Sequence, residues 1–574
     1  MRTFHFAVSV ILAFALSGCG NSKDAPVSLV TGGLESFRDR LAELSKTACP
    51  VTNSTEGVRL FVSYGDERKR CTVLVGRGST FDQAWEGIVR KTGWGERRPK
   101  WLRGEVLRSY EAIKSSRLDS YLFSRTNVVD SFGVSFDPEF KVVALPPEVQ
   151  SRDFIHPKLF RFYYKRVLKF LTARTGKEVK KLPPRVYPFL CRGIFLDEAG
   201  EVHDLTYDED CCGRRVLADF SKETVRRQIR EAVDYLVSQV DGRGRFATGW
   251  KAGKDEALEG HNDVRHCGTV WAMSLAYEIC PSPELRSAID RAAHEIVRFS
   301  VSRDEKTAFV HGQKGRFSFG GTALAALALM AAFDVLQTDE FKTLSLKLGE
   351  GLLSMKHSSG KGWYVHYLDG MFNPLEKEFC VYYDGEAALA FLRLYETTQD
   401  RKWLEAGKGL VDFFIAHRKD YLGEHDHWQQ YCLNAYTRLA SDQQYWDYAM
   451  ANLRVSADKY GSIMTAAPTD LELLMNGYET LWRMRAKGLT SAETPEADAL
   501  AHRLLRRLSR IENHRFFPEI AMFMQNPGRC LGGFFSSNAD FCVRIDGVQH
   551  TLGGLILLYR HAEEILPIVS NTPI

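Results

Sequence analysis

The fold of this chain is decided by the stretch Val381-Tyr382-Tyr383-Asp384-Gly385-Glu386-Ala387-Ala388-Leu389-Ala390-Phe391-Leu392-Arg393-Leu394-Tyr395. After a polar, acidic start it is apolar on nearly every side, and it is longer than an ordinary strand. A helix that is apolar all round must be buried, so only its N-terminus can meet solvent. We therefore predict a buried helix with Asp384 as its N-cap residue and Glu386 in its first turn, where the helix dipole favours a carboxylate.

The next segment has a different pattern, and the pair of patterns recurs along the chain. Residues 400–417 place Trp403 and Phe414 on one stripe with charged residues off it, which predicts a half-exposed helix. Starts of further buried helices are predicted at 265–269, 320–323, 426–428, 469–472 and 544–550. The shortest interval between two starts, from Glu386 to Trp428, is 42 residues, which suits one helical hairpin. Stacked hairpins bury their faces against one another, and six of them can close into a ring.

This pattern, over roughly residues 221–561, resembles the six-hairpin glycosidase and uronyl-epimerase group, whose fold is an (α/α)6 toroid. The resemblance implies six inner helices inside six outer ones, with the inner N-termini converging on one end of a funnel. It also implies an enzyme that acts on a carbohydrate polymer, as a glycoside hydrolase or a sugar epimerase. No single family's complete catalytic motif is matched, and a fold shared by many chemistries does not choose among them. We predict a mainly α protein in which this toroid follows a smaller mixed α/β domain.

The chain divides into four predicted segments. Residues 1–18 form a signal peptide, 19–33 a tether, 34–215 a mixed α/β domain, and 216–574 the toroid domain. The α/β prediction rests on apolar residues that alternate with polar ones near the start of that segment, as in half-buried strands. The polar residues 208–215 are the expected connection between the two domains.

The start of the chain predicts a lipid anchor. Arg2 precedes a short apolar run, as in a secretory signal. The run ends in Leu16-Ser17-Gly18-Cys19, which resembles a lipobox, and this implies that Cys19 becomes the diacylated, palmitate-carrying N-terminus of a lipoprotein. Gly20 rather than Asp after the cysteine implies the outer membrane, facing the periplasm, if the bacterium is Gram-negative. The alternative is an ordinary signal peptide or a membrane anchor, although the run is too short for a stop-transfer helix.

Composition excludes few classes of function. Lys and Arg number 76 and Asp and Glu 72, a net charge of +4 that neither favours nor excludes nucleic acid, and we predict no nucleic-acid partner. We expect no membrane-spanning stretch beyond the signal. An odd number of cysteines remains after Cys19; Cys530 with Cys542, and Cys49 with Cys71, could be bridged. Because no CxxC pair occurs, we predict no metal, and also no cofactor, while the oligomeric state stays open.

The candidate catalytic residues lie at the predicted starts of buried helices: Asp384, Glu386, Asp426, His427, Asp546 and His550. Asp546 and His550 are four residues apart, so on a helix they share a face, and the carboxylate could orient the imidazole and set its pKa. The other four could supply a second acid from the opposite side of the ring. Hydrolysis needs two carboxyl groups beside the scissile bond, whereas epimerisation needs two bases on opposite faces of a carbon next to a carbonyl.

The candidate substrate-binding residues are basic or aromatic. Arg265, His266 and Arg544 could bind a carboxylate or phosphate, and Trp250, Trp363, Tyr383 and Trp428 could stack on sugar rings of a polysaccharide or oligosaccharide. The alternative is that these groups cap helices, pair across the ring and plug its mouth, in a non-catalytic protein that binds a glycan or another protein. The two hypotheses differ in whether acids and bases meet across an open cavity or are locked in salt bridges. A toroid of the lanthionine-cyclase type would need a Cys/Cys/His zinc site, which the cysteine spacing does not supply.

Overall fold

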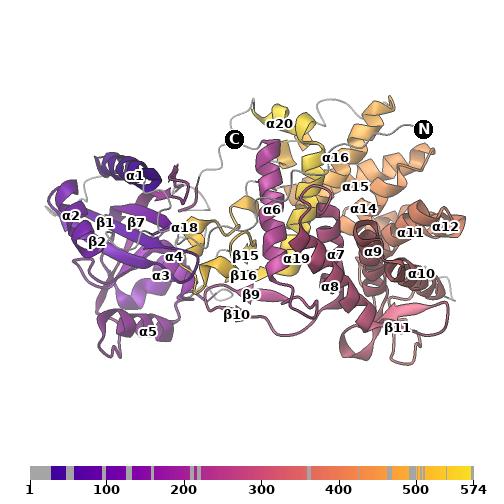
Figure 1. Cartoon of the computed structure of the whole chain (residues 1–574), viewed down its shortest axis with the longest axis horizontal. Coiled ribbons are helices and arrows are strands. Elements are labelled where there is room, and N and C mark those ends of the chain that lie inside the picture. Colours follow the sequence, from indigo (N-terminus) through magenta and orange to yellow (C-terminus); the bar gives the residue numbers. More distant parts are fainter. Residues whose placement is uncertain are drawn as a thin grey trace, which may run out of the picture.

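The structure is a computed structural model of the chain. It describes residues 28–46, 57–92, 99–123, 132–156, 161–206, 213–215, 221–357, 364–424, 426–461, 468–489, 499–500, 502–504, 507–508, 511–537 and 540–570. A sheet-containing N-terminal part and a ring of helices lie side by side along the longest axis (Figure 1). The predicted signal peptide 1–18, Cys19 and Trp363 lie outside the described residues, and helix α1 (Ser28–Lys46) begins within the predicted tether.

The N-terminal part is built on an antiparallel sheet with the strand order β2-β1-β3-β7-β5-β6, and β4 and β8 also pair with β7. Its strands are β1 (Val58–Gly65), β2 (Thr72–Gly78), β3 (Trp101–Tyr110), β4 (Ile113–Lys114), β5 (Phe132–Ser135), β6 (Val143–Ala144), β7 (Arg185–Leu196) and β8 (Val202–Asp204). Its other helices are α2 (Phe81–Thr92), α3 (Leu118–Phe123), α4 (Pro146–Ser151) and α5 (Tyr164–Thr175). Side chains alternate across the sheet, so Leu60 and Val62 of β1 pack with α1 and α2, whereas Phe61 packs against Phe140 and Phe189.

Six inner helices form a closed ring in the described part of the chain. They are α7 (Asp263–Ala276), α9 (Phe319–Leu336), α11 (Tyr383–Thr398), α14 (His427–Tyr436), α16 (Pro468–Ala486) and α19 (Ile545–Arg560). Each contacts the next, and α19 returns to contact α7. Around them pack α6 (Lys222–Ser238), α8 (Pro283–Phe299), α10 (Asp339–Ser354), α12 (Arg401–Ala416), α15 (Gln443–Gly461) and α20 (Ala562–Ser570). The predicted fold, mainly α with an (α/α)6 toroid beside a smaller sheet-containing part, is confirmed.

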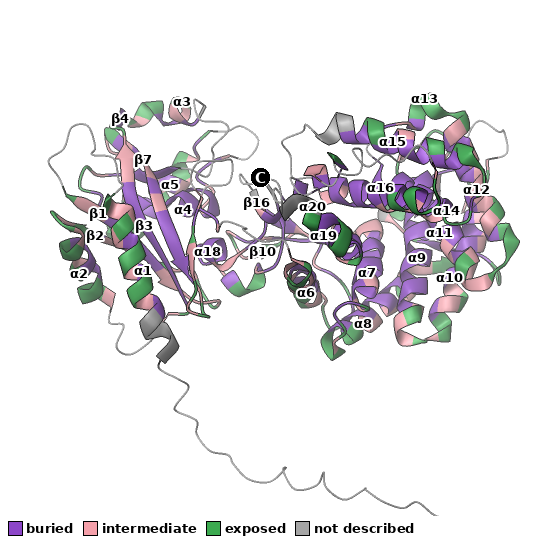
Figure 2. Ribbon diagram, turned by 90° about the horizontal axis from the view of Figure 1, so that it is seen from above, coloured by how far each residue is buried: buried purple, intermediate pink, exposed green. Residues whose placement is uncertain are grey.

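Burial follows the two predicted kinds of helix, because the inner helices are largely buried and the outer ones expose one side (Figure 2). Every residue of α9 from Phe319 to Ala332 is buried, whereas α6 buries one stripe that includes Val225 and Ile229. Among the described residues α9 is long and apolar enough to cross a membrane. Our expectation that no such stretch follows the signal was therefore wrong, and the ring explains the composition, since a helix enclosed by its neighbours is apolar all round.

One predicted helix cap is wrong. The N-cap residue of α11 is Tyr382, whose side chain makes no capping hydrogen bond, and the helix begins at Tyr383. Asp384 therefore lies inside the first turn, where its carboxylate is committed to other partners described below. Asp400 and Asp426 do cap α12 and α14, because each side chain accepts a hydrogen bond from a backbone N–H two residues on.

A second sheet and a short helix connect the ring to the N-terminal part. The sheet has the order β10-β9-β16-β15, and its strand β16 (Asp540–Arg544) runs directly into α19. Its other strands are β9 (Gly249–Lys251), β10 (Glu256–Ala257) and β15 (Phe535–Ser537). Helix α18 (Pro518–Ala521) contacts β3, where Arg103 donates to the backbone oxygen of Glu519 at 3.0 Å and Arg215 donates to its carboxylate at 2.8 and 2.9 Å. The loops of the ring also hold β11 (Ser300–Ser302), β12 (Ala308–Val310), β13 (Phe317–Ser318), β14 (Tyr367–Leu368) and α13 (Arg418–Tyr421).

Candidate active site

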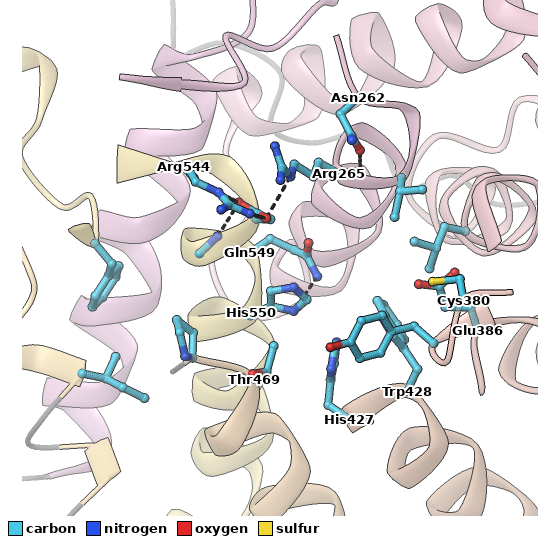
Figure 3. Close-up of a pocket in the computed structure, with 18 of the residues that line it drawn as sticks. Asn262, Arg265, Cys380, Glu386, His427, Trp428, Thr469, Arg544, Gln549 and His550 are labelled. Carbon is cyan, nitrogen blue, oxygen red and sulfur yellow. Dashed lines mark hydrogen bonds and ion pairs between the residues drawn. The ribbon is translucent and has the colours of Figure 1, made fainter. Parts of the chain in front are cut away.

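A cavity of about 750 Å³ lies where the inner helices begin (Figure 3). Eight of the predicted site residues line it: Arg265, Tyr383, Glu386, His427, Trp428, Arg544, Asp546 and His550. They belong to α7, α11, α14 and α19 or directly precede them, and Thr469 of α16 and Phe535 of β15 also contribute. The N-termini of the inner helices therefore converge on one cavity, as the toroid resemblance implied.

His550, which lines the cavity, is paired with Glu472, a residue of α16 that is completely buried. Glu472 Oε2 lies 2.8 Å from His550 Nδ1, and its other oxygen accepts a hydrogen bond from the Tyr431 hydroxyl at 3.0 Å. Sequence reasoning chose Asp546 as the partner of His550 and did not select Glu472 as a site residue. The sequence pattern at Glu472 is the same as the one that selected Glu386, namely a carboxylate at the start of a buried helix.

The electrostatic surroundings of His550 favour its protonated form. Burial lowers the pKa of His550, but the charge of Glu472 and its hydrogen bond raise it more, so that the pKa lies above its usual value. A proton can therefore be held between imidazole and carboxylate without leaving an unpaired buried charge. Such a pair is suited to general acid–base work near neutral pH.

A second imidazole adjoins the first. The ring of His427 lies 4.6 Å from that of His550 between centroids and is nearly perpendicular to it, at 84°. His427 Nε2 is 3.7 Å from the same Glu472 oxygen that contacts His550. The two histidines therefore share one carboxylate and sit side by side, rather than facing each other across the width of a substrate.

Glu386 is a carboxyl group kept in its neutral form. It is only 2% exposed, and this burial, together with the nearby carboxylates of Asp426 and Asp263, raises its pKa well above the usual value. Gly320 leaves the space that the Glu386 side chain fills, because a Cβ at position 320 would lie 2.1 Å from Glu386 Oε2. The raised pKa therefore favours a protonated carboxyl in the wall of the cavity.

Two guanidinium groups bracket Asp546. Arg265 Nε lies 2.9 Å from Asp546 Oδ2, and Arg544 Nε donates to Oδ1 at 2.9 Å while its Nη2 contacts Oδ2. Burial raises the pKa of Asp546, but the hydrogen bond and charge of Arg544 and the charge of Arg265 lower it more, so that the carboxyl is ionised. Because its charge is neutralised by two arginines, Asp546 is an anchor for them and a poor base.

Two of the predicted acids lie outside this cavity in fixed pairings. Asp384 is buried, accepts a hydrogen bond from the Tyr421 hydroxyl at 2.9 Å and lies 3.2 Å from His366 Nε2. Asp426 caps α14 through the backbone N–H of Trp428 at 2.9 Å. Asp384 is locked in the ring, as the non-catalytic alternative requires, and Asp426 holds the start of the helix that carries His427.

Two predicted binding residues are also buried in the framework. His266 lies with Nε2 at 2.9 Å from the backbone oxygen of Ala292, and burial lowers the pKa of His266 to about 4. Trp250 in β9 is covered by the guanidinium of Arg529, whose carbon lies 3.5 Å from the ring centroid. Neither side chain lines the cavity, so neither is placed to touch a substrate there.

The considered disulfides do not form among the described residues. Cys530 and Cys542 are both buried and are not bonded to each other, although they flank one segment of the second sheet. Cys71 is also free, and its suggested partner Cys49 lies outside the described residues. The ring is therefore held by packing and ion pairs in the part of the chain that the structure covers.

The chain is similar in structure to known carbohydrate-active enzymes. A sugar epimerase from a ruminal bacterium matches at 11% identity and a TM-score of 0.47, over 59% of this chain and 98% of that one. A cellobiose 2-epimerase from Spirochaeta thermophila matches at 14% identity and 0.45, over 60% and 98%. A GH76 α-mannanase from Bacteroides thetaiotaomicron matches at 12% and 0.43, over 60% and 97%. No protein family model and no curated protein sequence matches the chain.

Proposed function

We propose that this protein is a cell-envelope enzyme that acts on a carbohydrate polymer by acid–base chemistry in the cavity. The observation that carries the proposal is the pair of imidazoles, His427 and His550, on one buried carboxylate, with the neutral acid Glu386 in the same cavity. Asp384 is held by a hydrogen bond inside the ring, whereas Glu386, His427 and His550 all face the cavity. Acid and base groups that face a cavity favour an enzyme over a non-catalytic glycan-binding or protein-binding lipoprotein.

The geometry supports sugar epimerisation best. Epimerisation needs one group that removes a proton from a carbon beside a carbonyl and another that returns a proton to the opposite face. In Figure 3, Glu386 and His550 come from different inner helices and lie apart in the cavity wall. His550, in its neutral form and oriented by Glu472, would remove the proton, and the protonated Glu386 would supply one from the other side. His427 lies beside His550, so it is not placed to return a proton to the opposite face of the sugar carbon.

Glycoside hydrolysis is the second candidate, and one observation favours it. Glu386 and Asp546 both line the cavity, and their pKa values are shifted in opposite directions, by burial and by the arginines respectively. A neutral and an ionised carboxyl group are the pair that hydrolysis of a glycosidic bond requires. The two arginines on Asp546 weaken this candidate, because they reduce the basicity of that carboxylate.

The proposed location is the outer membrane, facing the periplasm, with the protein held by a lipid on Cys19. Support comes from the sequence 16–19 and from Gly20 after it. A neutral or acidic envelope polysaccharide or oligosaccharide is then the proposed partner, because Arg265 and Arg544 add positive charge to the cavity. Metabolic labelling with a radioactive fatty acid tests the anchor, and Cys19→Ser should abolish the label.

The test of the activity separates the two reactions in one experiment. The full chain in detergent is incubated with a panel of oligosaccharides in heavy water, followed by mass spectrometry and an assay for new reducing ends. Epimerisation places deuterium on a sugar carbon without chain cleavage, whereas hydrolysis releases reducing ends without carbon-bound deuterium. His550→Gln and Glu386→Gln should each slow turnover by about 10²–10⁴-fold. The controls His294→Gln on α8 and Glu350→Gln on α10 should not change it.

Binding of a glycan without product in every variant would support the binding-protein alternative. If neither product nor binding is found with any member of the panel, the carbohydrate proposal is wrong.

A further inference from the structure

Three side chains that could ligate a metal ion meet at the wall of the cavity, which two of them line. His427, Glu472 and His550 each offer one ligand atom, and these atoms all lie within 4.8 Å of one another. They belong to α14, α16 and α19, three neighbouring helices of the ring. Sequence reasoning predicted no metal because it looked for closely spaced cysteines, and these three donors are far apart along the chain.

The distances match those between ligands of a bound ion. Two donors at 2.0–2.1 Å from a tetrahedral Zn²⁺ are about 3.3 Å apart. Glu472 Oε2 lies 2.8 Å from His550 Nδ1 and 3.7 Å from His427 Nε2, on either side of that value. Small movements of the side chains would bring both contacts to it, and the ligand nitrogens of the two histidines lie within 4.8 Å of each other. Two histidines and one glutamate are also a ligand set of catalytic zinc sites.

The surroundings hold the ligands in place and leave one side open. The Tyr431 hydroxyl donates to the second oxygen of Glu472, which fixes the carboxylate as outer-sphere partners of metal ligands do. Gly553 makes room for it, because a Cβ there would lie 2.1 Å from Glu472 Oε1. His427 and His550 both line the cavity, so a water or a substrate oxygen could take the fourth position.

We propose that His427, Glu472 and His550 form a binding site for a divalent transition-metal ion of the Zn²⁺ type, and that this ion inhibits the reaction proposed above. The inhibition rests on the proposed function, whereas the binding does not. An ion held by His550 Nδ1 takes the lone pair of that atom, and the single proton of the neutral imidazole then lies on Nε2. With both ring nitrogens occupied, His550 no longer takes a proton from a sugar carbon, and removal of the ion restores it.

One other group of three such side chains occurs in the described residues and serves as the control. Asp197, Glu201 and His203 lie at the turn between β7 and β8 in the N-terminal part. Glu201 is 71% exposed there, and Asp197 is already bonded to backbone N–H groups of the turn. An exposed turn whose carboxylate is already satisfied holds an ion less well than three inward-facing donors.

The test is calorimetric titration of Zn²⁺ into the full chain in detergent, after treatment with a chelator. We expect a tight site that His427→Gln, His550→Gln and Glu472→Gln each weaken by more than about 100-fold, and Tyr431→Phe by about 10-fold. His203→Gln should leave it unchanged. Circular dichroism shows which variants fold. Three ligand variants are made because one folded variant among them is enough for the test.

The outcomes separate this inference from the proposed function. Loss of the tight site in His203→Gln, or its survival in folded ligand variants, or no binding by the natural protein, overturns the metal site. Those results leave sugar turnover in the heavy-water experiment untouched. Where turnover is found, Zn²⁺ should suppress it and a chelator should restore it; turnover that is unchanged at saturating Zn²⁺ overturns the inhibition.

Discussion

At the scale of single residues, the charge of Glu472 decides at which pH His550 can accept a proton. Glu472 raises the pKa of His550 against the opposing effect of burial, so the neutral imidazole forms only at higher pH. In Glu472→Gln the charge is gone and burial lowers the pKa instead. We predict that the acidic limb of the pH–rate profile, recorded with a chelator present, moves to lower pH in this variant. An unchanged limb would mean that another group sets it.

Glu386, the proposed catalytic acid, should reduce the stability of the folded protein at neutral pH. Its pKa is raised in the folded protein, so stability is fully present below the pKa of an unfolded glutamate and is lost as the pH rises through the folded value. Glu386→Gln removes this loss. We predict a higher Tm than the natural protein at about pH 7 and the same Tm at about pH 4, together with lost turnover. Glu350→Gln on α10, which breaks a largely solvent-exposed ion pair with Lys402, should change the Tm much less at both pH values.

Sequence reasoning reached part of the site at this scale. It selected His427, Glu386 and His550 because polar residues at the start of a buried helix lie at the solvent-facing end of the ring. It missed Glu472 as the partner of His550, since the spacing of four residues favoured Asp546. The choice between the two carboxylates depends on the packing of α16 against α19, which no local pattern contains.

At the scale of one element, helix α19 should tolerate alanine at one glycine and not at another. A Cβ at Gly553 would lie 2.1 Å from Glu472 Oε1 and 2.9 Å from the Tyr431 hydroxyl, so Gly553→Ala should destabilise by about 1–3 kcal/mol. A Cβ at Gly547 meets no atom closer than 4.0 Å. Gly547→Ala should therefore stabilise by about 0.5–1 kcal/mol, since it restricts the unfolded chain. Urea denaturation measures both, and equal effects would contradict the packing of α19.

The helices themselves were predictable because their apolar patterns are long. The prediction of a half-exposed helix over 400–417 agrees with α12, whereas the cap of α11 was misplaced at Asp384. A short acidic residue before an apolar run is a cap signal, but here the tertiary partners Tyr421 and His366 hold the carboxylate inside the first turn. Tertiary hydrogen bonds overrode the local preference.

At the scale of the whole molecule, the buried ion pair between Arg215 and Glu519 joins the N-terminal part to the ring. Glu519 is completely buried and accepts two hydrogen bonds from Arg215, whereas Asp197 and Glu201 act on Arg215 only through smaller charge effects. Glu519→Gln should cost about 3–5 kcal/mol, because it removes the hydrogen-bonded counter-charge of a largely buried guanidinium. Glu563→Gln, which breaks the exposed pair with Lys222, should leave the urea midpoint unchanged. A small effect of Glu519→Gln would mean that the two parts are held by other contacts.

The ring was foreseeable, because hairpins that repeat must cover one another's apolar faces. The docking of α18 on β3 was not, since Arg103 and Glu519 belong to segments with no shared pattern. Contacts between distant segments of this kind are fixed by shape and charge complementarity, which become visible only when both surfaces have formed.

Closure of the ring between α19 and α7 constrains when the protein can finish folding. The first inner helix cannot cover its open side until the last one has left the ribosome, so the nascent chain has no complete core to form early. The proposed export across the inner membrane needs an unfolded chain, and late closure of the ring would leave the chain unfolded for longer. The folded protein would then need no built-in instability in order to be exported.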